Sequence, residues 1–193
     1  MRGLAANPLI RRLMWRLWAL LLCLPGLASA DQAPISEDAL KAALVFNFAK
    51  FVEWPAKAFA DARTPISLCL YRESVSEFRT ALSAFQGKQV QGRDIQVRAG
   101  VLQKDLVGCH ILFIPEAHER WLPDVLRVAG TQNILTVSDL DDFVDNGGMI
   151  ELLHQDGQPR FAINQETAQR AGLKISAQLL KLAKNVKGKA GTP

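Results

Sequence analysis

The chain has 193 residues, with 23 Lys or Arg and 19 Asp or Glu, which gives a formal net charge of +4 at pH 7. Four of the basic residues and none of the acidic ones lie among residues 1–30, so the remainder carries 19 charges of each sign. The net positive charge is therefore a property of the amino-terminal segment, and it gives no reason to expect nucleic-acid binding.

Residues 1–30 have the pattern of a signal peptide. A basic start precedes the apolar run Leu17–Leu24, and Ala28-Ser29-Ala30 supplies the small residues at which a signal peptidase cleaves. The apolar run is too short for a stable membrane anchor, although a retained anchor is the alternative. Cleavage would leave 163 residues, enough for a single domain over 31–186, followed by a disordered tail at 187–193.

The segment Leu40–Pro55 predicts a helix that is buried on more than one side. Its large apolar residues recur at helical spacing, and few polar positions interrupt them. Ser36 is a suitable amino-terminal cap, and the two acidic residues after it suit the positive end of the helix dipole. Pro55 prevents the helix from continuing.

The middle of the chain alternates strand-like and helix-like segments. Apolar or alternating runs predict strands at Pro65–Tyr71, Asp94–Ala99, His110–Ile114 and Asn133–Val137. Between them, helical segments are predicted at Ser76–Gln86, at 101–107 as a short turn, and at Glu116–Ala129, where Pro123 must interrupt or restart the helix. This alternation predicts an α/β fold with a mostly parallel sheet.

The carboxyl-terminal part predicts a β-hairpin followed by two helices. Residues 149–154 and 160–164 flank a turn rich in Gln, Asp, Gly and Pro, and helices are expected at 164–171 and 176–186. Alternation along a strand buries only one of its two faces, so some apolar hairpin residues are expected to face outward and bind a partner. The alternative is that other parts of the protein cover both faces of the hairpin. The residues concerned are Met149, Ile150, Leu152, Phe161 and Ile163.

The sequence contains none of the common catalytic motifs. It lacks a dinucleotide-binding glycine motif, a phosphate-binding loop and a G-x-S-x-G nucleophile elbow. The three histidines, His110, His118 and His154, do not have the spacing of paired metal ligands. We therefore expect no enzyme activity, cofactor or metal. The alternative is a thiol enzyme in which Cys69 is the nucleophile and His110 or His118 is the base.

Two cysteines, Cys69 and Cys109, remain outside the signal peptide. In an exported protein an even pair predicts one disulfide, and the alternative is two separate buried thiols. The two residues are too far apart in the sequence for C-x-x-C redox chemistry or a zinc knuckle.

One edge of the predicted sheet is a candidate ligand site. In open parallel sheets, small molecules bind outside the carboxyl ends of the strands at the point where the strand order reverses. Arg72, Glu116 and His118 follow two of the predicted strands and bring a guanidinium, a carboxylate and an imidazole to that edge. They are the candidate ligand-binding residues, and a solvated rim of loop side chains is the alternative.

Three blocks of the sequence resemble the YfiR family of periplasmic regulators. They are LKAALVFNFAKFVEWP at Leu40–Pro55, GCHILFIP at Gly108–Pro115, and Gly147–Lys184 with its glycine pair, its hairpin, R-F-x-I-N and R-A-G-L-K-x-S-x-x-L-L. The resemblance implies a Rossmann-like three-layer sandwich, and the two cysteines match one cysteine pair of the family. A second pair found in some members, around residues 147–153, is absent here, so a redox switch that depends on it lacks its residues.

The resemblance also implies a function. The best-understood members form dimers and repress an inner-membrane diguanylate cyclase by binding its periplasmic sensor domain, and cyclic-di-GMP and biofilm formation rise when that repression is relieved. We therefore expect a homodimeric periplasmic repressor whose partner is such a cyclase. A periplasmic small-molecule-binding sensor is the alternative.

Overall fold

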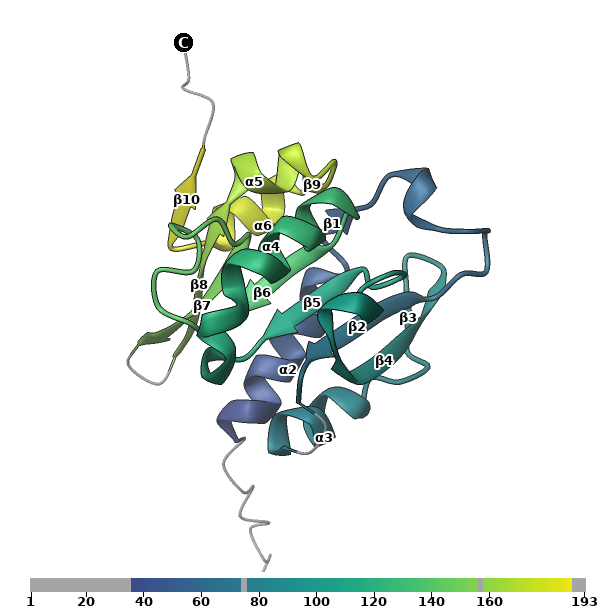
Figure 1. Cartoon of the computed structure of the whole chain (residues 1–193), viewed down its shortest axis with the longest axis horizontal. Helices are drawn as coiled ribbons and strands as arrows, with labels where there is room; N and C mark the ends of the chain where they lie inside the picture. The colour runs from purple at the N-terminus through teal and green to yellow at the C-terminus, as the bar shows by residue number, and fades with distance from the viewer. Residues whose placement is uncertain (1–35, 74–75, 156–157, 189–193) are drawn as a thin grey trace, which may run out of the picture. The chain divides into compact units, whose positions relative to one another are not determined.

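The computed structural model describes residues 36–73, 76–155 and 158–188 (Figure 1). The signal peptide predicted for residues 1–30 lies outside these residues, as do the turn of the predicted hairpin at 156–157 and residues 189–193 of the predicted tail.

Within the described residues, eight strands form one mixed sheet in the order β10-β8-β7-β6-β5-β2-β4-β3. The neighbouring strands run parallel except in the β7–β8 and β3–β4 pairs, and a separate antiparallel ladder joins β1 to β9. The strands are β1 (Val52–Glu53), β2 (Ile66–Tyr71), β3 (Gln89–Val90), β4 (Arg93–Val101), β5 (Ile111–Ile114), β6 (Leu135–Ser138), β7 (Ile150–Gln155), β8 (Gln158–Asn164), β9 (Lys174–Ile175) and β10 (Asn185–Lys187).

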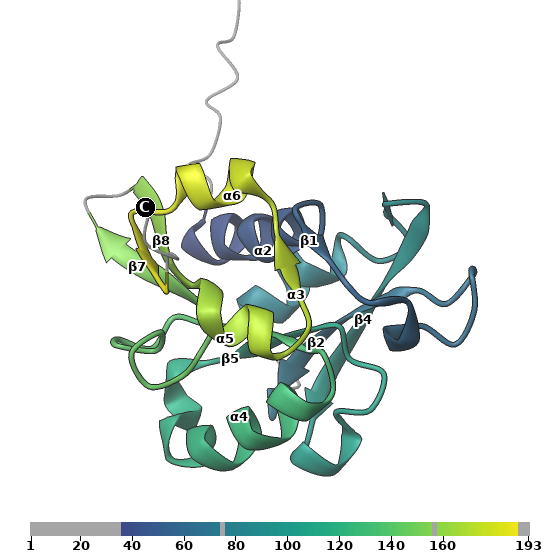
Figure 2. The same ribbon diagram turned by 90° about the horizontal axis from the view of Figure 1, so that it is seen from above.

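Helices cover both faces of this sheet, as Figure 2 shows for α2 and α4 on either side of β5. The helices are α2 (Glu37–Phe48), α3 (Glu77–Ser83), α4 (Leu122–Thr131), α5 (Gln165–Arg170) and α6 (Ala177–Leu182), with 3₁₀ turns η1 (Ala56–Ala58), η2 (Gln103–Asp105) and η3 (Glu116–Trp121). Alternation along β2 separates two cores: Leu68 and Leu70 pack with α2 and α3, whereas Cys69 and Tyr71 pack with α4. The α/β class predicted from the sequence is confirmed, and the two antiparallel pairs make the sheet mixed.

Helix α2 forms as predicted at its start but ends earlier than expected. The Ser36 Oγ accepts a hydrogen bond from the Ala39 N–H at 3.2 Å, which caps the helix. The helix ends at Phe48, because Val52 adopts an extended backbone and pairs with Ile175 in the β1–β9 ladder. The predicted extension of the helix to residue 55 was therefore wrong.

The carboxyl-terminal region contains the predicted hairpin, in which Leu152 lies opposite Phe161. The last helix is shorter than the predicted 176–186, because α6 ends at Leu182 and the chain then enters β10. Lys187, expected to begin a disordered tail, instead pairs with Asn164 in the parallel β8–β10 ladder.

The glycine pair before β7 has a steric reason at each position. Gly147 has φ of +95°, a conformation that residues with a Cβ rarely adopt. A Cβ on Gly148 would overlap the ring of Phe143, which is fully buried and has no room to move away. The pair therefore lets the chain pass beneath an aromatic ring as it enters the sheet.

Candidate functional site

The strand order of the sheet reverses between β2 and β5. From β2 the chain passes through α3 to β4 on one side, and then returns to β5 on the other side of β2. Helices α3 and α4, which follow β2 and β5, pack into different cores on the two faces. The segments that follow β2 and β5 therefore lead to opposite faces of the sheet, and this is the position at which open α/β sheets bind ligands.

Five side chains gather at this position and are called here the switch-point cluster: Tyr71, Arg72, His118, Arg120 and Trp121. The Tyr71 and His118 rings meet edge to face, with centroids 5.9 Å apart. The guanidinium carbons of Arg72 and Arg120 lie 4.8 and 5.2 Å from the centre of the Trp121 ring. Both arginines are exposed, whereas His118 and Trp121 are partly buried. The cluster is therefore a basic and aromatic surface.

Backbone geometry fixes the two segments that form the cluster. Arg72 has φ of +55°, which is uncommon for a residue with a side chain, and its N–H donates to the Val101 carbonyl at 2.9 Å. His118 has non-helical backbone angles that kink η3, so Arg120 and Trp121 follow a change in chain direction. Local geometry, and not a regular helix, brings these side chains together.

The electrostatics of the cluster are dominated by positive charge. Burial lowers the pKa of His118, and the positive charges of Arg72 and Arg120 lower it further, although the Glu73 carboxylate opposes them. The Trp121 Nε1–H is buried and has no hydrogen-bond acceptor among the described residues.

Two of the three predicted ligand-binding residues come together, and the third has other contacts. The Glu116 N–H donates to the Asp139 Oδ1 at 3.0 Å, and the other Asp139 oxygen pairs with the Lys41 Nζ at 2.9 Å. None of the contacts found among the described residues joins the Glu116 side chain to Arg72 or His118. Arg120 and Trp121 were not singled out from the sequence, because their approach to Arg72 depends on the kink in η3.

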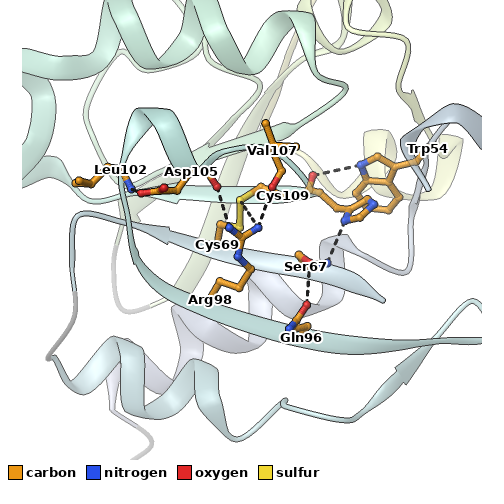
Figure 3. Close-up of a disulfide and its surroundings, with 10 residues drawn as sticks. Trp54, Ser67, Cys69, Gln96, Arg98, Leu102, Asp105, Val107 and Cys109 are labelled. Carbon is orange, nitrogen blue, oxygen red and sulfur yellow. Dashed lines mark hydrogen bonds between the residues drawn. A yellow bond between two sulfur atoms is a disulfide. The ribbon is translucent and has the colours of Figure 1, made fainter. Parts of the chain in front are cut away.

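The structure contains a disulfide between Cys69 on β2 and Cys109 just before β5 (Figure 3). Their Cα atoms are 5.9 Å apart, within the usual range for a bridge, and both residues are almost fully buried. The oxidised protein therefore has no Cys69 thiol, and the alternative of a catalytic Cys69 does not fit this state.

Arg98 holds the segment around η2 next to the disulfide. This residue lies opposite Cys69 in the β2–β4 ladder. Its guanidinium donates to the carbonyls of Asp105 at 2.8 Å and Val107 at 3.0 Å, and it lies 3.7 Å from the Cys109 sulfur (Figure 3). The Val107 side chain itself is 73% exposed. Arg98 therefore links the buried disulfide to the backbone of the exposed residue Val107.

His110 occupies a structural position. Its Nδ1 accepts a hydrogen bond from the Ser67 N–H at 3.1 Å, so its Nε2 carries the proton and donates to the Ala58 carbonyl at 3.1 Å. The ring stacks on Phe59 with centroids 4.5 Å apart. Burial lowers the pKa of His110, and the positive charge of Arg93 adds to this effect. The residue joins the loop after η1 to the sheet in its neutral form.

The hairpin residues predicted to face a partner lie in the core. All five side chains are buried in the layer that contains α2, and the Phe161 ring meets the Phe48 ring edge to face at 5.2 Å. The structure therefore corrects the expectation that these apolar residues face outward. They lie on a covered face of the hairpin, which was the alternative. The five residues are Met149, Ile150, Leu152, Phe161 and Ile163.

These features define a disulfide-bridged α/β domain with a basic and aromatic cluster at its strand-order reversal. Residues 38–184 match the model of the family described as YfiR/HmsC-like, and the chain belongs to this family. None of the curated proteins matches the chain significantly. Within the described residues, no helix has the length and apolar character needed to cross a membrane.

The solved structures that resemble the chain distantly include a protein described as an ABC domain in complex with L-Trp from Streptococcus pneumonia. It has 13% sequence identity and a TM-score of 0.45 over 63% of this chain, which spans 55% of the length of that protein.

Proposed function

We propose that the protein is a periplasmic regulator that binds and represses the sensor domain of an inner-membrane diguanylate cyclase, and thereby controls cyclic-di-GMP and biofilm formation. The family match over residues 38–184 carries this proposal. The signal-peptide pattern of residues 1–30 and the Cys69–Cys109 bridge support an oxidising compartment outside the cytoplasm.

The regulator acts by binding and not by catalysis. Cys69, which is the only cysteine that the sequence offered as a nucleophile, is bridged, and His110 uses both ring nitrogens for backbone hydrogen bonds. Neither residue is thus available in this state for the thiol chemistry considered above. The absence of enzyme activity stays a prediction, and assays of the purified protein against general hydrolase and thiol-transfer substrates test it.

The partner contact includes the segment around η2. Three large apolar side chains are exposed among the described residues, and two of them, Leu102 and Val107, flank η2 beside the disulfide. Arg98 fixes the backbone of this segment, so the apolar side chains are presented on an ordered surface. The third, Leu182, lies in α6 and supplies a matched control.

A periplasmic pull-down tests the function. The tagged protein should retain a membrane diguanylate cyclase, and deletion of its gene should raise cellular cyclic-di-GMP. Val107→Asp should weaken the capture, whereas Leu182→Asp should not. Unchanged cyclic-di-GMP in the deletion strain would contradict the function, and equal capture by the two variants would contradict only the proposed surface. The homodimer predicted by the resemblance is measured separately by light scattering of the purified protein.

A further inference from the structure

We propose that the switch-point cluster binds a small organic or inorganic anion through a carboxylate or phosphate group, which Arg72 and Arg120 hold beside Trp121. This inference goes beyond the proposed function, because it adds a small-molecule ligand to a protein-binding regulator.

The first support is the arrangement of charge. Both guanidinium groups lie over the same indole ring, at 4.8 and 5.2 Å from its centre, and neither has an ion pair among the contacts of the described residues. The ring therefore has two positive charges beside it and no carboxylate that pairs with either of them within the described residues. Guanidinium groups match the geometry of carboxylate and phosphate oxygens, so an anion beside this ring would gain charge-assisted hydrogen bonds from them.

The second support is the unpaired indole donor. The Trp121 Nε1–H is shielded from solvent and has no acceptor within the described part of the chain. Buried polar groups almost always have a partner, and this indole N–H is a donor that a bound water or ligand oxygen can satisfy. An oxygen of the anion is a suitable acceptor, because Arg72 and Arg120 attract it to this ring.

The third support is the position and backbone of Arg72. The residue begins the loop after β2, on one side of the strand-order reversal, and η3 after β5 supplies the opposite side. Its φ of +55° is held by the hydrogen bond from its N–H to the Val101 carbonyl. Uncommon backbone conformations of this kind are concentrated at ligand sites, where the fold fixes the direction of a side chain.

The imidazole of His118 connects this site to pH. The charged groups that act on it are Arg72, Arg120 and Glu73. An anion bound by the two arginines compensates their positive charge, so binding should raise the pKa of His118. By linkage, the anion should bind more tightly as the pH falls toward the range in which His118 gains its proton.

Nuclear magnetic resonance of the purified, oxidised protein tests the proposal with two probes, inorganic phosphate and succinate, at an ionic strength kept constant with sodium chloride. At least one probe should shift the Trp121 indole N–H and His118 ring signals saturably, and the probe that does so identifies the phosphate or carboxylate class. Arg72→Gln and Arg120→Gln should each weaken binding by about tenfold or more. Arg79→Gln, at an exposed arginine on α3, is the control and should bind normally.

Two results would overturn the proposal. One is the absence of a saturable shift with either probe in the parent protein. The other is an equal loss of binding in the Arg79→Gln control, which would show that only the overall charge matters. Because the measurement needs no cyclase, failure here leaves the proposed regulatory function standing, and failure to capture a cyclase leaves this site standing.

Discussion

Removal of the Cys69–Cys109 bridge gives a direct measure of how much the disulfide stabilises the fold. The two residues are separated by 40 positions, and the chain-entropy relation for a loop of this length gives about 4 kcal/mol at 25 °C. For a domain of about 150 residues, each kcal/mol shifts the melting temperature by about 2–4 °C, so the loss corresponds to about 8–16 °C.

The assay compares four samples by circular dichroism melting: the oxidised parent, the parent with a phosphine reductant, and the Cys69→Ala and Cys69→Ala/Cys109→Ala variants. The reduced parent and both variants should melt within a few degrees of one another and well below the oxidised parent. Reductant should not change the melting of the double variant, which controls for effects of the reductant elsewhere.

Equal melting of the parent with and without reductant, in samples whose thiol content proves that the bridge was first present and then reduced, would refute this reasoning. It would mean that the packing around the two sulfurs alone holds β2 and β5 together. The native bridge would then contribute nothing beyond the contacts that both buried residues already make.

Three further predictions use other features of the fold. Gly148→Ala should lower the free energy of unfolding by about 2 kcal/mol in urea, through overpacking, whereas Gly130→Ala, a helical position with open space around it, should be neutral or slightly stabilising. Arg72→Gln should raise the pKa of His118 in a proton resonance titration, because it removes a neighbouring positive charge; an unchanged pKa would contradict the cluster geometry. The pKa of His110 is lowered in the folded state, so the unfolded state binds more protons below the ordinary pKa of about 6.5. Stability measured in urea should therefore fall from pH 7.5 to 5.5, and the fall should be smaller in His110→Gln.

The strands at the centre of the sheet were predictable because their side chains are buried on both faces of the sheet. In β5, Ile111 and Phe113 enter one core, and Leu112 and Ile114 enter the other, so the strand is apolar throughout. The same reasoning fails at the carboxyl terminus. Residues 176–186 have helical spacing, but pairing with β8 turns Asn185–Lys187 into a strand, and a tertiary contact of this kind leaves no local pattern.

Sequence reasoning placed Arg72 and His118 at one edge of the sheet, where the structure also has them, but it did not include Arg120 or Trp121. Arg72 and His118 were accessible because residues directly after parallel strands share one edge. Trp121 lies seven residues after Ile114 and beyond the kink at His118, so its contact with Arg72 could not be read from the sequence spacing. The burial of the hairpin could not be predicted from the sequence of the hairpin itself, because it involves packing against Phe48 of α2, more than a hundred residues away in the sequence.

Strand β2 connects the disulfide to the switch-point cluster. Cys69 bonds this strand to the residue that precedes β5, and Arg72 follows its last residue. The switch-point cluster is completed by η3, which leaves the carboxyl end of the same β5. The disulfide therefore fixes, from within the protein, the two strands whose ends hold the arginines and the indole. The bridge and the cluster are therefore joined through the same pair of strands.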